Sequence, residues 1–243
     1  MNRLNILDYD YPELANYLLN MNVMRKILLT YYNFNTYGLL RSNPSFNNEL
    51  YNSFTLHVDG FGAYYFSKIL FENKLKHNIN GSDLYPVLIH KLICSGKRIF
   101  IVFPMLSNVK QIEKSICNFF ESNYKSVDFG IYNENCPDEL LKKIKIFEPY
   151  VVFVGLGQPY QELWVLKNKD AISSNLIVCC GSGLEFLLNQ KKRAPIGVQK
   201  LKLEWAYRLV QEPKRLWKRY ILGIPVFIFH VFVQKTNLMF KKD

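Results

Sequence analysis

A carboxylate at the end of an apolar run is the first candidate for chemistry in this sequence. Asp59 follows the run 53–58 and is itself followed by Gly60. A carboxylate placed in this way is suited to accept a proton from a substrate hydroxyl, as a general base does. Asp-Gly pairs also favour turns, so a purely structural turn is the alternative interpretation. His57 has no nucleophile or metal partner beside it in the sequence, and we interpret it as structural.

Four glycines in two short segments point to a second kind of chemistry, the binding of phosphate. Each segment follows an apolar run, and glycine lets the backbone come close to a ligand. The third glycine and the later acidic residue of a dinucleotide-binding fingerprint are missing, so a single G-x-G pair is a weak signal. We interpret both segments as turns that contact the donor of a transferred group. The four positions are Gly155, Gly157, Gly181 and Gly183.

The first glycine segment leads into a helix that is expected to start near Pro159. Free amides at a helix start attract an anion, so this end of the helix is suited to a phosphate. Gln161 and Glu162 follow within the first turn. They either take part in the site or only cap the helix, and the residues alone leave both interpretations open.

The C-terminal part of the chain carries nearly all of the excess positive charge. The 243 residues include 31 Lys and Arg against 20 Asp and Glu, and residues 190–243 hold thirteen of the former against three of the latter. A basic tail on a nearly neutral body predicts an anionic partner, which is a phospholipid surface, a nucleic acid or a diphosphate.

Arginines and aromatic residues alternate in this tail. Arg208, Arg215 and Arg219 recur at spacings that place them on one side of a continuous helix, where guanidinium groups bind phosphate oxygens. A solvated basic face is the alternative. The thirteen apolar residues 221–233 that follow would span about 20 Å as a helix, against about 30 Å of hydrocarbon, so we expect them to lie on a membrane without crossing it. Nucleic acid is not expected, because stacking platforms need no such run. The interleaved aromatic residues are Trp205, Tyr207, Trp217 and Tyr220.

No cofactor or metal site is expected. The five cysteines form no C-x-x-C pair and the four histidines lie far from them in the sequence, which argues against zinc and against a disulfide framework. Asp8 and Asp10 superficially match the Asp-x-Asp of metal-dependent sugar-nucleotide enzymes, but they precede the first strand and sit among aromatic residues. The N-terminus has no long apolar core, so we expect a cytoplasmic protein.

The elements that must position these residues form an α/β pattern. Short runs that are apolar on both faces are typical of a parallel sheet covered by helices. Segments 108–122 and 137–147 predict crossover helices between them. Ligands of such sheets bind beyond the carboxyl ends of the strands, where Asp59 and the glycine segments stand. The predicted strands are 27–32, 53–58, 98–103, 126–131, 150–155 and 175–180.

The strand pattern stops after Pro195. We therefore predict a Rossmann-like catalytic domain over residues 1–195, with a mostly parallel sheet and flanking helices. Residues 196–243 are predicted as a basic, aromatic-rich helical appendage that associates with a membrane, with helices over 198–211 and 213–220.

Linked motifs make the chain resemble the WecG/TagA/CpsF glycosyltransferases, glycosyltransferase family 26, which have a GT-E-like fold. Residues 151–220 contain VGLGQPYQELW, GSGLEFLLNQKKRAP and KLEWAYRLVQEPKRLWKRY in the order of that family. VDGFG and NGSDL upstream are similar to its Asp-Gly and Gly-Thr-Asp motifs. The resemblance covers nearly the whole chain.

The resemblance implies an inverting, metal-independent hexosyltransferase. Such an enzyme moves an N-acetylmannosamine-type or related sugar from a UDP-sugar to a polyprenyl-diphosphate-linked sugar, in the synthesis of a cell-surface polysaccharide or a teichoic acid linkage unit. It is peripheral on the cytoplasmic face of the membrane and forms homo-oligomers that dissociate there.

The resemblance also implies roles for single residues. Asp59 matches the proposed general base and Gln161 a catalytic glutamine beside the donor. Asn33 and Asn35 match a Thr-x-Asn motif at the donor site, with Asn33 in place of Thr, and Glu185 replaces the Asp of a Phe-Asp pair. With the four glycines, Pro159 and Glu162, they form the implied donor site. The residues implied to bind the acceptor and its diphosphate are Arg193, Arg208, Arg215, Lys218 and Arg219.

Two other functions are compatible with parts of the pattern. The strand-glycine-helix segments also suit a nucleotide-dependent oxidoreductase. The basic tail alone suits a non-catalytic module that binds membranes or nucleic acids. The linked motifs favour the transferase.

Overall fold

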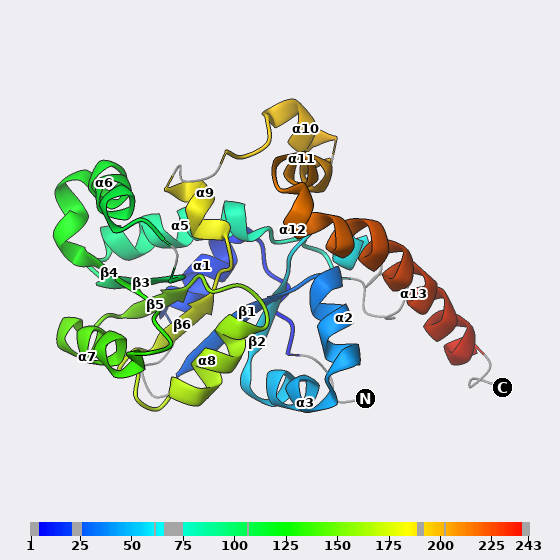
Figure 1. Ribbon diagram of the computed structural model, residues 1–243, viewed down its shortest axis with the longest axis horizontal. Coiled ribbons are helices and arrows are strands. Elements are labelled where there is room, and N and C mark those ends of the chain that lie inside the picture. The colour runs from blue at the N-terminus through cyan, green and yellow to red at the C-terminus, as the bar shows by residue number, and fades with distance from the viewer. Residues whose placement is uncertain are drawn as a thin grey trace.

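Six parallel strands form the centre of the molecule (Figure 1). The computed structural model of the chain describes residues 5–20, 26–60, 62–65, 75–105, 107–188, 192–201 and 203–239. The strand order is β2-β1-β6-β5-β3-β4, and all six predicted strands are confirmed to within two residues at either end. The strands are β1 (Ile27–Tyr32), β2 (Thr55–Val58), β3 (Ile99–Phe103), β4 (Val127–Ile131), β5 (Val151–Val154) and β6 (Leu176–Cys179).

Helices cover both faces of the sheet because the strands alternate two apolar sets of side chains. In β3, Ile99 and Ile101 belong to the core cluster under α1, α5, α6 and α9, while Phe100 and Val102 belong to the cluster under α2, α3, α7 and α8. The predicted crossover helices are confirmed as α6 and α7. The bounds are α1 (Tyr11–Asn20), α2 (Phe34–Ser42), α3 (Pro44–Ser53), α5 (Gly81–Cys94), α6 (Val109–Phe120), α7 (Pro137–Phe147), α8 (Tyr160–Asn168) and α9 (Gly183–Leu187).

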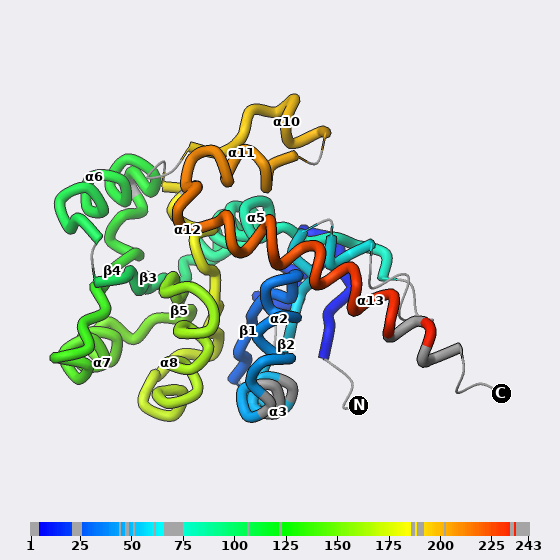
Figure 2. Tube along the Cα trace, turned by 45° about the vertical axis from the view of Figure 1, so that its right-hand side comes forward, coloured from blue at the N-terminus to red at the C-terminus, as the bar shows by residue number. Residues whose placement is uncertain are grey.

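The C-terminal region is helical but differs from the prediction. The single helix predicted over 198–211 is wrong, because α10 and α11 are separate short helices. The helix predicted over 213–220 does not end there: α12 continues through a π-helical turn into α13, and the chain runs past α2 and away from the sheet (Figure 2). Pro225 has no amide to donate to the preceding turn, and the wider π turn directly before it accommodates this loss. The bounds are α10 (Ile196–Lys200), α11 (Glu204–Gln211), α12 (Pro213–Trp217), the π turn (Lys218–Leu222) and α13 (Gly223–Met239).

Aromatic contacts dock this long helix on α2. The rings of Tyr37 and Phe227 meet edge to face at 5.0 Å, and those of Phe34 and Tyr220 lie 5.5 Å apart. The segment Pro213–Val233 is long and apolar enough to cross a membrane by length and composition alone, which the sequence analysis did not expect. One of its faces nonetheless packs against α2 through these aromatic contacts.

Candidate active site

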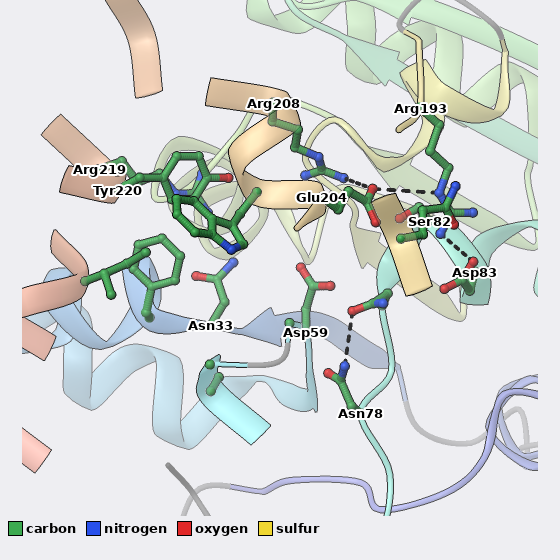
Figure 3. A pocket seen from close by; sticks show the side chains of 18 of the residues that line it. Asn33, Asp59, Asn78, Ser82, Asp83, Arg193, Glu204, Arg208, Arg219 and Tyr220 are labelled. Carbon is green, nitrogen blue, oxygen red and sulfur yellow. Dashed lines mark hydrogen bonds and ion pairs between the residues drawn. The ribbon is translucent and has the colours of Figure 1, made fainter. Parts of the chain in front are cut away.

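A cavity of about 530 Å³ lies beyond the carboxyl ends of β1 and β2, between the sheet domain and the C-terminal helices (Figure 3). It brings together five of the predicted catalytic and binding residues, which come from both parts of the chain. A second cavity of about 590 Å³, lined by Tyr132, Tyr160 and Trp164 among others, contains none of them. The five residues on the first cavity are Asn33, Asp59, Arg193, Arg208 and Arg219.

Asp59 stands directly after β2, and its carboxylate lies on the cavity (Figure 3). Its backbone amide donates to the carbonyl of Tyr32 at 3.0 Å, which continues the β1–β2 ladder by one bond. Its Oδ1 accepts the amide of Gly81 at 3.2 Å, at the start of α5. A carboxylate has about four lone-pair sites, so one such bond orients the group and leaves it able to accept a proton from a hydroxyl.

Asn33 lies beside Asp59, at the end of β1 (Figure 3). It is the N-cap of α2, and its Oδ1 accepts the amides of Asn35 at 3.0 Å and Thr36 at 3.1 Å. A cap of this kind uses the side-chain oxygen, so the NH₂ group is the part of Asn33 suited to a ligand. Asn35 supplies a backbone amide to the cap and is outside the cavity lining.

Three arginines reach the cavity from the far side. Arg193 donates to Asp83 at 2.6 Å, and Arg208 donates to Glu204 at 3.1 Å (Figure 3). The guanidinium of Arg219 lies over the ring of Phe34, 5.5 Å from its centre. Arg193 precedes α10, Arg208 belongs to α11 and Arg219 belongs to the π turn, so the three arginines come from three separate segments.

Two of the residues implied to bind the acceptor and its diphosphate lie elsewhere. Arg215 pairs with Glu212 at 2.5 Å, and Lys218 lies over the ring of Trp217. Neither residue is in the lining of the cavity. The break between α11 and α12 removes the continuous helical side that the spacing suggested, and a role for these two residues stays a prediction.

Gln161 and Glu162 are fully buried beneath the ends of the strands. Gln161 accepts the amide of Gly181 at 2.9 Å and donates to Glu162 at 2.9 Å. Glu162 Oε1 also accepts the hydroxyl of Thr30 at 2.6 Å and the amide of Gln158 at 3.3 Å. Burial raises the pKa of the Glu162 carboxyl, against the lowering effect of these hydrogen bonds. Both residues therefore tie β1, α8 and the turn after β6 together.

The glycine segments end β5 and β6, and none of their residues lines the cavity. Gly157 and Gly181 have φ of +79° and +53°, which L side chains rarely adopt. A Cβ on Gly183 would meet the ring of Tyr85 at 2.5 Å. These positions require glycine for backbone shape and packing, while donor binding by them stays a prediction, as it does for Pro159 and Glu185.

Several residues of the cavity were missed by the sequence analysis. Glu204 lies four residues before Arg208, a spacing that indicates a helical ion pair. Asp83 belongs to the NGSDL run, which was noted without a role. Asp8 and Asp10, by contrast, have structural partners: Asp8 accepts the amides of Lys76 and His77, and Asp10 caps α1. In the part of the chain that is described, no group of three His, Cys, Asp or Glu is placed to hold a metal ion.

Comparison with known proteins decides the class of the protein. The family model described as glycosyl transferase WecG/TagA/CpsF family matches residues 2–241. The chain belongs to the WecG/TagA/CpsF family. This membership makes it a glycosyltransferase, and it excludes the oxidoreductase and the non-catalytic module as descriptions of the whole chain.

Relatives within the WecG/TagA/CpsF family have named activities. Proteins from Staphylococcus aureus strains MW2, NCTC 8325 / PS 47 and COL are each named N-acetylglucosaminyldiphosphoundecaprenol N-acetyl-beta-D-mannosaminyltransferase. Each is 27% identical to this chain over 184 residues, which cover 74% of this chain and 70% of the relative.

Proposed function

We propose that this glycosyltransferase moves an N-acetylmannosamine-type or related hexose from a UDP-sugar to a sugar linked to a polyprenyl diphosphate, with inversion at the anomeric carbon. The names of the relatives support the class of acceptor and the type of sugar. The product would be an intermediate of a cell-surface polysaccharide or of a teichoic acid linkage unit. The observation that carries the proposal is one cavity that holds both Asp59 and three arginines.

The two kinds of residue suit the two ends of the acceptor. In a sugar diphosphate, one sugar ring separates the hydroxyl that attacks from the diphosphate on the anomeric carbon. A site for it must therefore offer a base and cations within the same space. Asp59 is the base, and Arg193, Arg208 and Arg219 bind the diphosphate.

In the reaction, Asp59 takes the proton of the acceptor hydroxyl as its oxygen forms a bond to the anomeric carbon of the donor. The bond from that carbon to UDP breaks on the opposite face, and the electron pair leaves with the diphosphate. A single displacement of this kind inverts the configuration. Because the arginines bind the diphosphate of the acceptor, the negative charge that develops on UDP would be stabilised by the helix start near Pro159, as first predicted, which lies outside the lining of the cavity.

The C-terminal helices are proposed to place the cavity at the inner face of the membrane. Val226, Phe229 and Phe232 of α13 are each more than half exposed, whereas Phe227 and Val231 on the opposite side are buried. An exposed apolar side with cations at one end suits a helix that lies in the headgroup region. A lipid-linked acceptor held there would present its diphosphate to the arginines. Homo-oligomers that dissociate at the membrane stay a prediction.

The test is to replace Asp59 with Asn, which keeps the shape and removes the basicity. UDP-N-acetylmannosamine and other UDP-sugars are incubated with a short-chain prenyl-diphosphoryl N-acetylglucosamine, and products are measured by mass. Turnover is expected to fall by about 10²–10⁴ while donor binding is retained. Asp170→Asn, at an exposed position outside both cavity linings, is the control and should act like the wild type. Normal turnover by Asp59→Asn contradicts the role of Asp59.

A further inference from the structure

The cations of the cavity are already paired with carboxylates of the protein itself. Arg193 Nη2 lies 2.6 Å from Asp83, and its Nε lies 3.7 Å from Glu204 Oε1. The same Glu204 oxygen accepts a hydrogen bond from Arg208 at 3.1 Å. Glu204 therefore bridges an arginine of the connecting segment and an arginine of α11, at a single oxygen atom.

This pairing differs from an ordinary surface ion pair. The side chain of Glu204 is only 19% exposed and lines the cavity, as do both of its arginines. The same helical region offers a comparison: Glu212 and Arg215 form a similar pair eight residues later, but they lie outside the cavity lining. Glu204 is thus placed where the ligand of the arginines would lie, and Glu212 is not.

The charged residues of the cavity lining determine how this placement affects a bound diphosphate. Among the described residues of the lining, the cations are Arg193, Arg208, Arg219 and Lys200, and the carboxylates include Asp83 and Glu204 besides Asp59. A diphosphate that binds Arg208 must lie within a few ångströms of the Glu204 carboxylate. Two negative charges at this short separation repel each other strongly in a partly desolvated site. The attraction of Arg208 is then shared between the diphosphate and the Glu204 carboxylate.

We propose that Glu204 is an internal competitor of the diphosphate. Its carboxylate holds Arg193 and Arg208 while the cavity is empty, and the ligand binds by taking over these guanidiniums. The inference rests on the proposed function, because it assumes that the arginines bind a diphosphate. Its consequence is selectivity: a bare diphosphate binds weakly, whereas a ligand with a sugar for the Asp59 side and a lipid for the exposed helix gains enough further contacts to displace Glu204.

The experiment measures the binding of inorganic pyrophosphate by calorimetry to the full-length wild type, Glu204→Gln and Glu212→Gln. Glutamine keeps the size of the side chain and removes the charge. Glu204→Gln is expected to bind pyrophosphate about tenfold more tightly than the wild type, and Glu212→Gln equally well. A gain of affinity is a result that damage to the fold does not produce, so it reports the lost competition.

Equal or weaker binding by Glu204→Gln overturns the inference and makes Glu204 a residue that orients the arginines. Arg208→Gln separates this from a failure of the proposed function. If Arg208→Gln weakens pyrophosphate binding while Glu204→Gln does not strengthen it, only the competitor role is wrong. If neither the wild type nor Glu204→Gln binds pyrophosphate, or if Arg208→Gln binds it as the wild type does, the arginines are not a diphosphate site and both ideas are contradicted.

Discussion

Glu162 shows how one buried group stabilises the carboxyl edge of the sheet. Its Oε1 accepts hydrogen bonds from three side chains, and its Oε2 is buried with no hydrogen-bond partner among the described residues. Ionisation of the carboxyl is unfavourable here because the second oxygen is desolvated, and burial therefore raises its pKa. The proton is retained at pH values where an exposed glutamate would have lost it.

Glu162→Gln should make the stability of the protein less dependent on pH. The pKa of Glu162 in the folded protein lies above the usual glutamate value of 4.5, so at pH values between the two the folded state binds more protons than the unfolded state. The free energy of unfolding of the wild type then falls as the pH rises through this window, by up to about 1.4 kcal/mol per pH unit. Glutamine does not titrate and keeps an oxygen for the three donors.

The measurement is urea unfolding of both proteins from pH 4.5 upwards. The difference in unfolding free energy should move in favour of Glu162→Gln as the pH rises. Glu113→Gln, at an exposed position of α6, is the matched control and should follow the wild type. Parallel curves for Glu162→Gln and the wild type would mean that the buried carboxyl does not titrate differently in the two states.

At the level of elements, one face of α13 packs on α2 and the opposite face is exposed. Phe227 is 4% exposed and packs on Tyr37 of α2, while Phe229 is 64% exposed. The two residues are two positions apart, which on a helix places them on different sides. This arrangement holds the helix against the body and leaves apolar surface outside.

Phe227→Ala and Phe229→Ala should therefore have different effects. Loss of a buried phenylalanine costs about 3–5 kcal/mol in a protein core, so Phe227→Ala should release α13 and speed the hydrogen exchange of its amides. Phe229→Ala should leave exchange unchanged and weaken binding to anionic vesicles by about tenfold, because a membrane-buried phenyl ring is lost. Unchanged exchange in Phe227→Ala would show that other contacts dock the helix.

At the scale of the whole molecule, the hydrophobic core and the cavity draw on different parts of the chain. Both hydrophobic core clusters are formed by residues up to Leu188. The cavity also needs the C-terminal helices, since Arg208, Arg219 and Tyr220 line it. We therefore predict that the sheet region folds without these helices and that the site does not form without them.

Deletion of residues 198–243 is expected to leave a folded domain that neither binds anionic vesicles nor transfers sugar to a lipid-linked acceptor. The removed segment carries most of the net charge of +11 and the exposed apolar side of α13. Binding of the full chain to vesicles should also weaken as salt increases, because headgroup attraction is screened. Co-sedimentation and product mass are the readouts. Normal transfer by the truncated protein would show that the appendage is dispensable.

The sequence by itself was sufficient for the six strands and for the crossover helices α6 and α7. Residues 99–103 are apolar at every position, and this pattern requires no knowledge of distant residues to indicate a buried strand. Asp59 was found in the same way, as a carboxylate at the end of a run. Local patterning failed where helices continue or break: α12 runs on through a π turn into α13, and α10 and α11 are two helices where one was predicted.

The composition of the site was decided only by tertiary structure. Asp59 and Arg208 are far apart in the chain, and their presence on one cavity follows from how the appendage packs over the ends of β1 and β2. Sequence spacing likewise grouped Arg215 with Arg208, whereas only Arg208 lines the cavity, because α11 ends before α12 begins. The physical reason is that spacing along a helix specifies the direction of a side chain only relative to its own axis. Whether that direction leads into the cavity is set by how the helix packs against segments that are remote in sequence.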